Sequence, residues 1–104
     1  MNQSQFLYLT TKGWKTGKHH KIEIWYVEYN DKYYVMSERR EHAHWVQNII
    51  RNSRILCNVK FKSFEGTARI VYQQNDSDLA TKISALMNSK YRWDEGLIIE
   101  ITPH

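Results

Sequence analysis

Little in this sequence cross-links or interrupts the chain. Its 104 residues include one cysteine, one proline and four glycines. Because Cys57 has no second thiol to pair with, an internal disulfide and a metal site made of thiolates are both excluded, and packing must hold the fold together. Uncharged runs are far shorter than the roughly 20 apolar residues of a membrane span, and no signal-peptide pattern precedes Phe6. These absences predict one folded domain over residues 1–104, located in the cytoplasm.

Positive charge is in modest excess and is concentrated in one stretch. Fifteen lysine and arginine residues stand against eleven aspartate and glutamate residues, which gives a formal net charge of +4. Part of the excess falls within one short segment, which also holds His19 and His20 and contains Lys12, Lys15, Lys18 and Lys21. A basic stretch of this kind favours an anionic partner, either a phosphorylated cofactor or a nucleic acid.

Alternating apolar and polar residues predict six short β-strands. Asn30-Asp31 has the residue types of a two-residue hairpin turn, and Lys62-Ser63 is predicted to form a second tight turn. The predicted strands are Phe6–Thr11, Ile22–Tyr29, Lys32–Ser37, Ile55–Phe61, Phe64–Tyr72 and Leu97–Thr102.

Two segments have helical spacing instead. Between about Ala43 and Arg51, Trp45 pairs with Ile49 at i,i+4, as Val46 does with Ile50. A second helix begins near Asp76 or Ser77, either of which can cap it, and carries on one face Leu79, Ile83, Leu86 and Met87.

Six hairpin-linked strands in a small domain would leave exposed edges unless the sheet closes on itself. The sequence therefore predicts a mainly β fold, a six-stranded antiparallel barrel with two helices. The outer faces of Ile22–Tyr29 and Lys32–Ser37 are rich in Trp and Tyr, which predicts that a second copy covers them in a homodimer.

The segment from Thr10 to His20, placed between the first two strands, has the composition of a phosphate-binding loop. Gly13 and Gly17 allow tight turns that bring backbone N–H groups toward a ligand, and Thr16 offers a hydroxyl. Cationic donors come from Lys15, Lys18 and His20. The spacing does not match a Walker loop, and a solvated basic hairpin loop accounts for these residues equally well.

Four motifs in one register, from about Leu9 to Val59, resemble the deazaflavin-dependent nitroreductase and quinone reductase family. They are Thr10-Thr11-x-Gly13-x-Lys15-Thr16-Gly17, Ile24-Trp25-Tyr26-Val27, Tyr34-Val35-Met36-Ser37 and Trp45-x-x-Asn48. The resemblance implies an FMN-binding type of split β-barrel. It also implies hydride transfer by bound coenzyme F-420 to a small electrophile such as a quinone or nitro compound, with the cofactor carrying the reaction and no catalytic side chain.

The same resemblance assigns cofactor-binding residues. Trp14 and His20 stand where the family usually has arginine, and Glu38-Arg39-Arg40 stands where it tends to have Lys-Gly-Gly, which leaves FMN beside F-420 as the predicted cofactor. The cofactor is expected near a dimer interface. Its predicted contacts are Lys15, Thr16, Gly17 and His20 on the phosphate side, with Trp14 in the same loop, Trp25 beside the cofactor, Met36 and Ser37 at the ring, and Trp45 and Asn48 flanking it.

Other candidate residues favour ordinary roles. Cys57 alternates with core residues of a strand, which predicts packing rather than a nucleophile. His42 and His44 lack carboxylate or thiolate partners, so no metal site is predicted. Tyr91, Arg92 and Trp93 belong either to the core and a turn or to a substrate mouth across a dimer.

Two other functions remain open. Aromatic residues interleaved with lysines are also typical of a small barrel that binds single-stranded nucleic acid, although clustering of the lysines in one loop disfavours it. The other is a flavin-binding barrel that carries its cofactor without turnover. The aromatic residues in question are Trp14, Trp25, Tyr26, Tyr33, Tyr34 and Trp45.

Overall fold

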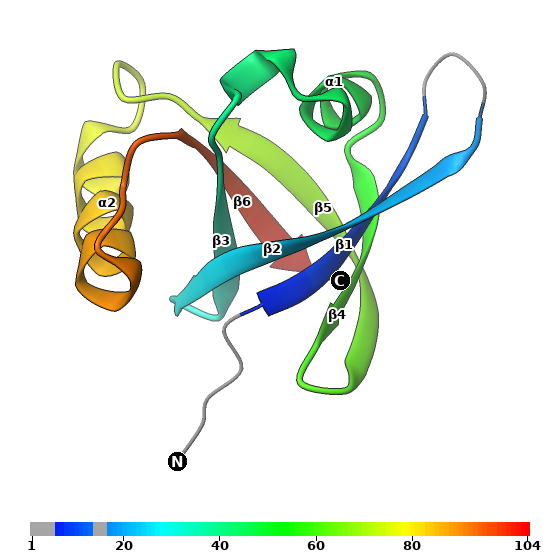
Figure 1. Cartoon of the computed structure of the whole chain (residues 1–104), viewed down its shortest axis with the longest axis horizontal. Helices are drawn as coiled ribbons and strands as arrows, with labels where there is room; N and C mark the ends of the chain where they lie inside the picture. Colours follow the sequence, from blue (N-terminus) through cyan, green and yellow to red (C-terminus); the bar gives the residue numbers. More distant parts are fainter. Residues whose placement is uncertain (1–5, 14–16) are drawn as a thin grey trace.

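Six antiparallel strands close into a barrel in the computed structural model, which describes residues 6–13 and 17–104. Around the barrel the strand order is β1-β2-β3-β6-β5-β4 (Figure 1). This confirms the predicted six-stranded antiparallel barrel with two helices. The elements are β1 (Phe6–Lys12), β2 (His19–Tyr29), β3 (Lys32–Ser37), a short 3-10 turn η1 (Arg40–His42), α1 (His44–Arg51), β4 (Arg54–Val59), β5 (Lys62–Val71), α2 (Ser77–Tyr91) and β6 (Leu97–Pro103).

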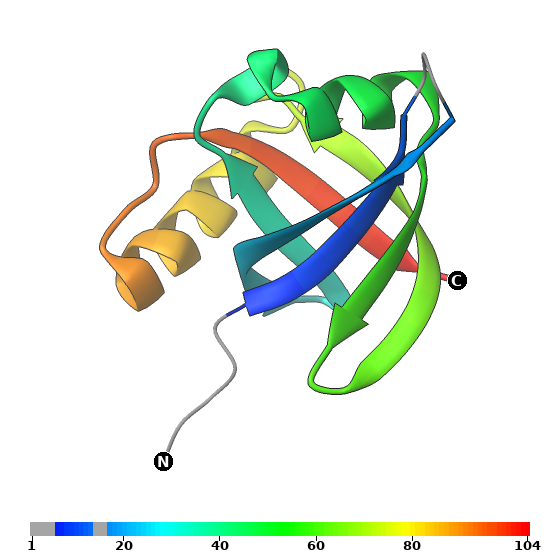
Figure 2. The same ribbon diagram turned by 45° about the vertical axis from the view of Figure 1, so that its right-hand side comes forward.

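The barrel interior is filled by alternate residues of the strands, as period-two patterning requires. Leu7 and Leu9 of β1 are fully buried there, and Val35 of β3 and Ile99 of β6 are fully buried as well. Helix α1 lies across one end of the barrel (Figure 2) and adds Val46 and other buried residues to the same cluster. The interior is therefore a packed core, and any ligand must bind outside it.

Helix α2 packs against the outside of the barrel. Val27, Tyr34 and Met36 point outward from β2 and β3, and they form a second core with Ile83 and Met87 of α2. The sequence predicted that a second copy of the chain covers this apolar face. That prediction is wrong for these residues, because the helix predicted after Asp76 folds back over them.

The β4–β5 hairpin turns two residues earlier than predicted. Its two-residue turn is Lys60-Phe61, with φ of 52° and 69°, and Val59 pairs with Lys62. Lys62-Ser63 therefore lies within β5, and Phe61 is fully exposed at the tip rather than in a strand. Alternation fixes which face a side chain occupies, and moving a turn by two residues leaves every face unchanged.

The β1–β2 hairpin is longer, and its loop shorter, than the predicted loop from Thr10 to His20. Thr11 pairs with His20 and Lys12 pairs with His19, so both ends of that segment belong to strands. Gly17 has a φ of 75°, a conformation that favours glycine, and its N–H donates to the Gly13 carbonyl at 2.8 Å. The basic stretch is thus carried mainly by paired strands.

Candidate functional site

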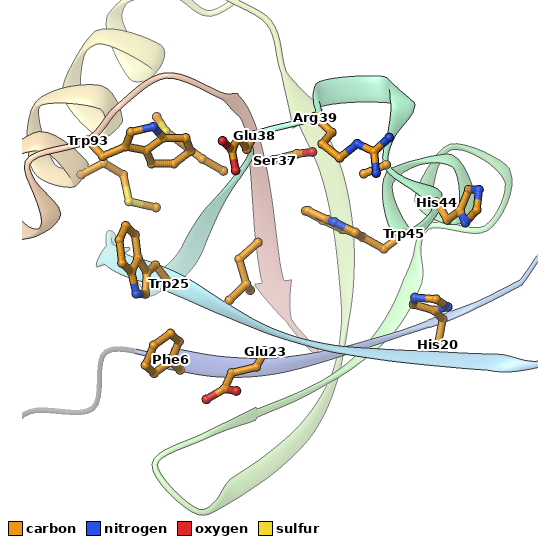
Figure 3. Close-up of a pocket in the computed structure, with 14 residues that line it drawn as sticks. Phe6, His20, Glu23, Trp25, Ser37, Glu38, Arg39, His44, Trp45 and Trp93 are labelled. Carbon is orange, nitrogen blue, oxygen red and sulfur yellow. The ribbon is translucent and has the colours of Figure 1, made fainter.

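A cavity of about 650 Å³ lies beside the barrel, within the size range of small-molecule sites. Its walls come from β2, the end of β3, the segment from Glu38 to Trp45 and the segment after α2 (Figure 3). Met87 of α2 and Phe6 of β1 complete the lining. Segments from both halves of the sequence therefore meet at one site.

Five of the predicted cofactor-binding residues line this cavity. They are His20, Trp25, Met36, Ser37 and Trp45. Their contacts with a cofactor stay a prediction.

The other predicted residues lie elsewhere. Gly17 lines a separate surface hollow with Lys12 and Arg51. Asn48 is buried, and its Nδ2 donates to Thr11 Oγ1 at 3.0 Å, a bond that ties α1 to β1. Trp14, Lys15 and Thr16 lie outside the described residues. Cofactor contact by each of these residues also stays a prediction.

One end of the cavity is an aromatic wall. The rings of Trp25 and Tyr91 are stacked, with centroids 4.6 Å apart and an interplanar angle of 1°. Trp93 meets Trp25 edge to face at 6.4 Å. Trp25, Trp93 and Phe6 gather at this end in Figure 3. Such surfaces offer stacking partners to a planar aromatic ligand.

Tyr91 fixes this wall to the barrel. Its hydroxyl accepts the N–H of Tyr26 at 3.1 Å and donates to the carbonyl of Tyr26 at 2.5 Å. Lys90 Nζ donates to the same carbonyl at 3.1 Å. Burial raises the pKa of Tyr91 to about 12, so the hydroxyl stays protonated at neutral pH and keeps its donor role. The end of α2 is therefore anchored to β2 directly behind Trp25.

Trp93 packs against the end of β3 through Gly96. A Cβ at position 96 would lie 2.9 Å from the Ser37 carbonyl oxygen and 3.0 Å from the Trp93 ring, closer than packed atoms normally come. Glycine is therefore needed for the Trp93 segment to approach Ser37. The structure thus places Trp93 in the cavity wall and Tyr91 in support of it, within one chain.

The opposite end of the cavity carries three basic side chains. His20 comes from β2, Arg39 precedes η1, and His44 is the first residue of α1. They lie together at one end of the view in Figure 3. In the part of the chain that the structure describes, no hydrogen bond or ion pair engages these three side chains. The carboxylates of Glu23 and Glu38 also line the cavity.

Cys57 belongs to the barrel core and not to this site. It is buried, and burial raises the pKa of its thiol to about 12, which keeps it unreactive.

Within residues 6–13 and 17–104, no three His, Cys, Asp or Glu side chains come together to hold a metal ion. Over the same residues, no helix has the length and apolar character needed to cross a membrane.

The chemistry of the cavity fits a cofactor with a flat ring and an anionic end. The indoles of Trp25 and Trp93 lie at one end, and at the other lie basic side chains without a partner among the described residues, so a ring and a phosphate would each meet suitable groups. A model of the F420H(2)-dependent quinone reductase family matches residues 1–95. The chain belongs to this family. It is thus one of a family of flavin- or deazaflavin-binding reductases, with F-420 or a flavin as its cofactor.

Solved structures share the fold at low sequence identity. An F420-H2 dependent reductase is 21% identical, with a TM-score of 0.67 over 97% of this chain and 96% of that one. An FAD-binding protein from Mesorhizobium loti is 10% identical, with a TM-score of 0.74 over 97% of this chain and 82% of that one. A protein described as a domain-swapped dimer is 21% identical, with a TM-score of 0.66 over 99% of this chain and 82% of that one. None of the curated proteins compared with the chain matches it.

Several lining residues were not predicted from the sequence. Arg39 stands where the chain departs from the family pattern, and that departure was the available signal. Trp93 belonged to a segment whose role the sequence left open. Phe6 and Met87 gave no signal, because each reads as an ordinary core residue of its own element.

Proposed function

We propose that this protein is a reductase that transfers a hydride from bound F-420, or from FMN, to a small electrophile such as a quinone or a nitro compound. The observation that carries the proposal is that the two ends of the cavity differ in chemistry. It has the aromatic wall of Trp25 and Trp93, in edge-to-face contact, at one end and His20, Arg39 and His44 at the other. The family match supports the same activity.

The roles of the side chains follow from this arrangement. Bound F-420 or FMN supplies the hydride chemistry. Trp25 and Trp45 present indoles to the ring, and Ser37 lies at the end of β3 where its backbone can contact the ring edge. Apolar lining from Met36 and Met87 excludes water. The protein therefore binds, orients and shields, and no side chain is assigned acid–base chemistry.

A homodimer with the cofactor near the interface is part of the same proposal. The outer face of β1 and β4 exposes Phe6, Tyr8 and Leu56, side chains that a second copy would bury. Phe6 also lines the cavity, which would bring the site to that interface. One solved neighbour is described as a domain-swapped dimer. Sedimentation at micromolar concentration tests this part, and a monomer would contradict it.

We place the protein in the cytoplasm, where a reduced Cys57 is expected.

The first experiment titrates the ligand-free protein with FMN and with F-420 in parallel, following ligand fluorescence. A single-stranded oligonucleotide is the control ligand. Saturable binding of one of the two cofactors, with no salt-sensitive oligonucleotide binding, is the expected result. Binding of neither cofactor would contradict the proposal, and oligonucleotide binding alone would favour the nucleic-acid function.

A second assay separates a reductase from a carrier. The loaded and reduced protein is mixed with a small quinone or a nitro compound, and reoxidation of the cofactor is followed by absorbance. Faster reoxidation than that of the free reduced cofactor is expected. An unchanged rate with tight binding would indicate a carrier without turnover.

A further inference from the structure

We propose that Arg39, assisted by His44, binds the cofactor's phosphate from the wall opposite the β1–β2 hairpin. This inference rests on the proposed function, because it concerns how the same cavity holds its anion. The loop motif placed phosphate binding on residues 15–17 and His20 alone. Arg39 and His44 come from a different segment, at the junction of β3 with α1.

The backbone around Arg39 is fixed, while its side chain has no partner among the residues that the structure describes. Ser37 Oγ donates to the Arg40 carbonyl at 2.9 Å, and the His42 N–H donates to the Arg39 carbonyl at 3.0 Å. Arg40 has a φ of 54°, an unusual conformation for a side chain other than glycine. These constraints hold the Arg39 backbone at the cavity rim. Its guanidinium makes no ion pair with the residues that the structure describes.

Two other arginines of this protein have carboxylate partners within the fold. Arg54 is paired with Glu65 at 3.2 Å, and Arg69 is paired with Glu100 at 2.7 Å. Arg39 lines a cavity instead, and no carboxylate of residues 6–13 and 17–104 lies within ion-pair distance of it. A guanidinium offers two parallel N–H groups to a phosphate, which makes an unpaired arginine at a cavity rim suited to that ligand.

Arg39 can also supply the guanidinium that is missing at position 20, where this chain has histidine. The resemblance indicates that the family usually has arginine at that position, and an imidazole cannot reproduce its bidentate bonds. Arg39 brings a guanidinium to the same end of the same cavity from the other side (Figure 3). Glu23 and Glu38 lie nearer the aromatic end in this view, where they would repel a phosphate and favour this orientation.

The test compares ligands that differ by their phosphate. FMN is paired with riboflavin, and F-420 is paired with the deazaflavin ring compound that lacks the phosphate and tail. Dissociation constants are measured for the wild type, Arg39→Gln and Arg40→Gln. Arg40→Gln is the matched control, since it removes the same charge one residue away and does not line the cavity.

Arg39→Gln is expected to weaken binding of the phosphorylated ligand about tenfold and to leave the phosphate-free ligand unchanged. Arg40→Gln should change neither by more than about twofold, and Arg39→Lys should recover part of the loss. Equal losses in Arg39→Gln and Arg40→Gln would overturn the inference while the proposed function stands. A wild type that binds none of the four ligands would overturn both.

Discussion

Two groups of charged side chains in this protein differ in whether their partners are present. On the outer wall, Glu100 is only 4% exposed, yet its carboxylate accepts bonds from Arg69 at 2.7 Å and from the Tyr34 hydroxyl at 2.8 Å. In the cavity, Arg39 and His20 have no such partners among the described residues. The charged groups of the outer wall are paired within the fold, whereas we propose that a ligand supplies the partner of the cavity groups.

The outer group also includes Lys32. Its charges are paired because an unpaired carboxylate at the buried position of Glu100 would lower the stability of the fold. Lys32 Nζ lies 3.7 Å from the same carboxylate. Burial opposes ionisation of Glu100, but bonds from Arg69 and Tyr34 outweigh it and lower its pKa. The pKa of Tyr34 is raised by burial and by its bond to Glu100. The two groups should therefore respond differently to the loss of one charge.

The largest expected effect is on stability. Glu100→Gln should lower the free energy of unfolding by about 2 to 4 kcal/mol, because it leaves the guanidinium of Arg69 without its main partner. Arg39→Gln should lower it by less than about 0.5 kcal/mol, since its side chain has no partner to lose among the described residues. Urea denaturation followed by circular dichroism measures both.

The control for this pair is Glu65→Gln on β5, whose ion pair with Arg54 is exposed on both sides. It should cost less than about 1 kcal/mol. A loss of stability in Arg39→Gln as large as that in Glu100→Gln would break the distinction between the two groups.

A smaller effect is expected where a structural bond supports the cavity. Tyr91→Phe removes the hydroxyl that bonds both backbone groups of Tyr26, and it should cost about 1 to 2 kcal/mol of stability. The stacked ring remains but is no longer anchored, so FMN and riboflavin should lose affinity equally, by about threefold. Tyr8→Phe, on an exposed face of β1, is the control for stability and for binding. Loss of FMN binding alone would place the phosphate, and not the ring, beside Tyr91.

The smallest expected effect is a dependence on pH. Pairing lowers the pKa of Glu100 in the folded protein, so its carboxylate contributes stability above its usual pKa of about 4.3. That contribution is lost as the pH falls through the lower pKa of the folded state. The stability difference between wild type and Glu100→Gln should therefore shrink between pH 6 and pH 3, both approximate limits set by this titration. A difference that stays constant would show that the carboxylate is not held ionised by its partners.

Periodicity predicted the strands well because alternate residues of the strands pack into the barrel core. Leu97, Ile99 and Ile101 were predicted on one side of a strand, and all three lie in the barrel core. Turn positions are less constrained, and Phe61 was placed in a strand because it continued the alternation of Ile55. The cover on the outer face was misassigned because alternation shows that a face is buried but not by what.

The candidate site was predictable only where one segment carries its own signature. His20, Trp25 and Trp45 belong to motifs that lie close together in the sequence. Arg39 and Trp93 reach the cavity because the β3–α1 junction and the end of α2 meet in space. No local pattern encodes that meeting, so these residues required the structure.

The central claim is that a bound cofactor lies with its ring at the aromatic end and its phosphate at the cationic end. Intermolecular nuclear Overhauser effects on the protein saturated with FMN or F-420 test it most directly. We expect ring protons of the ligand to show contacts with the indole protons of Trp25 and Trp93. Contacts of the ring with the imidazoles of His20 and His44, and none with those indoles, would contradict the account.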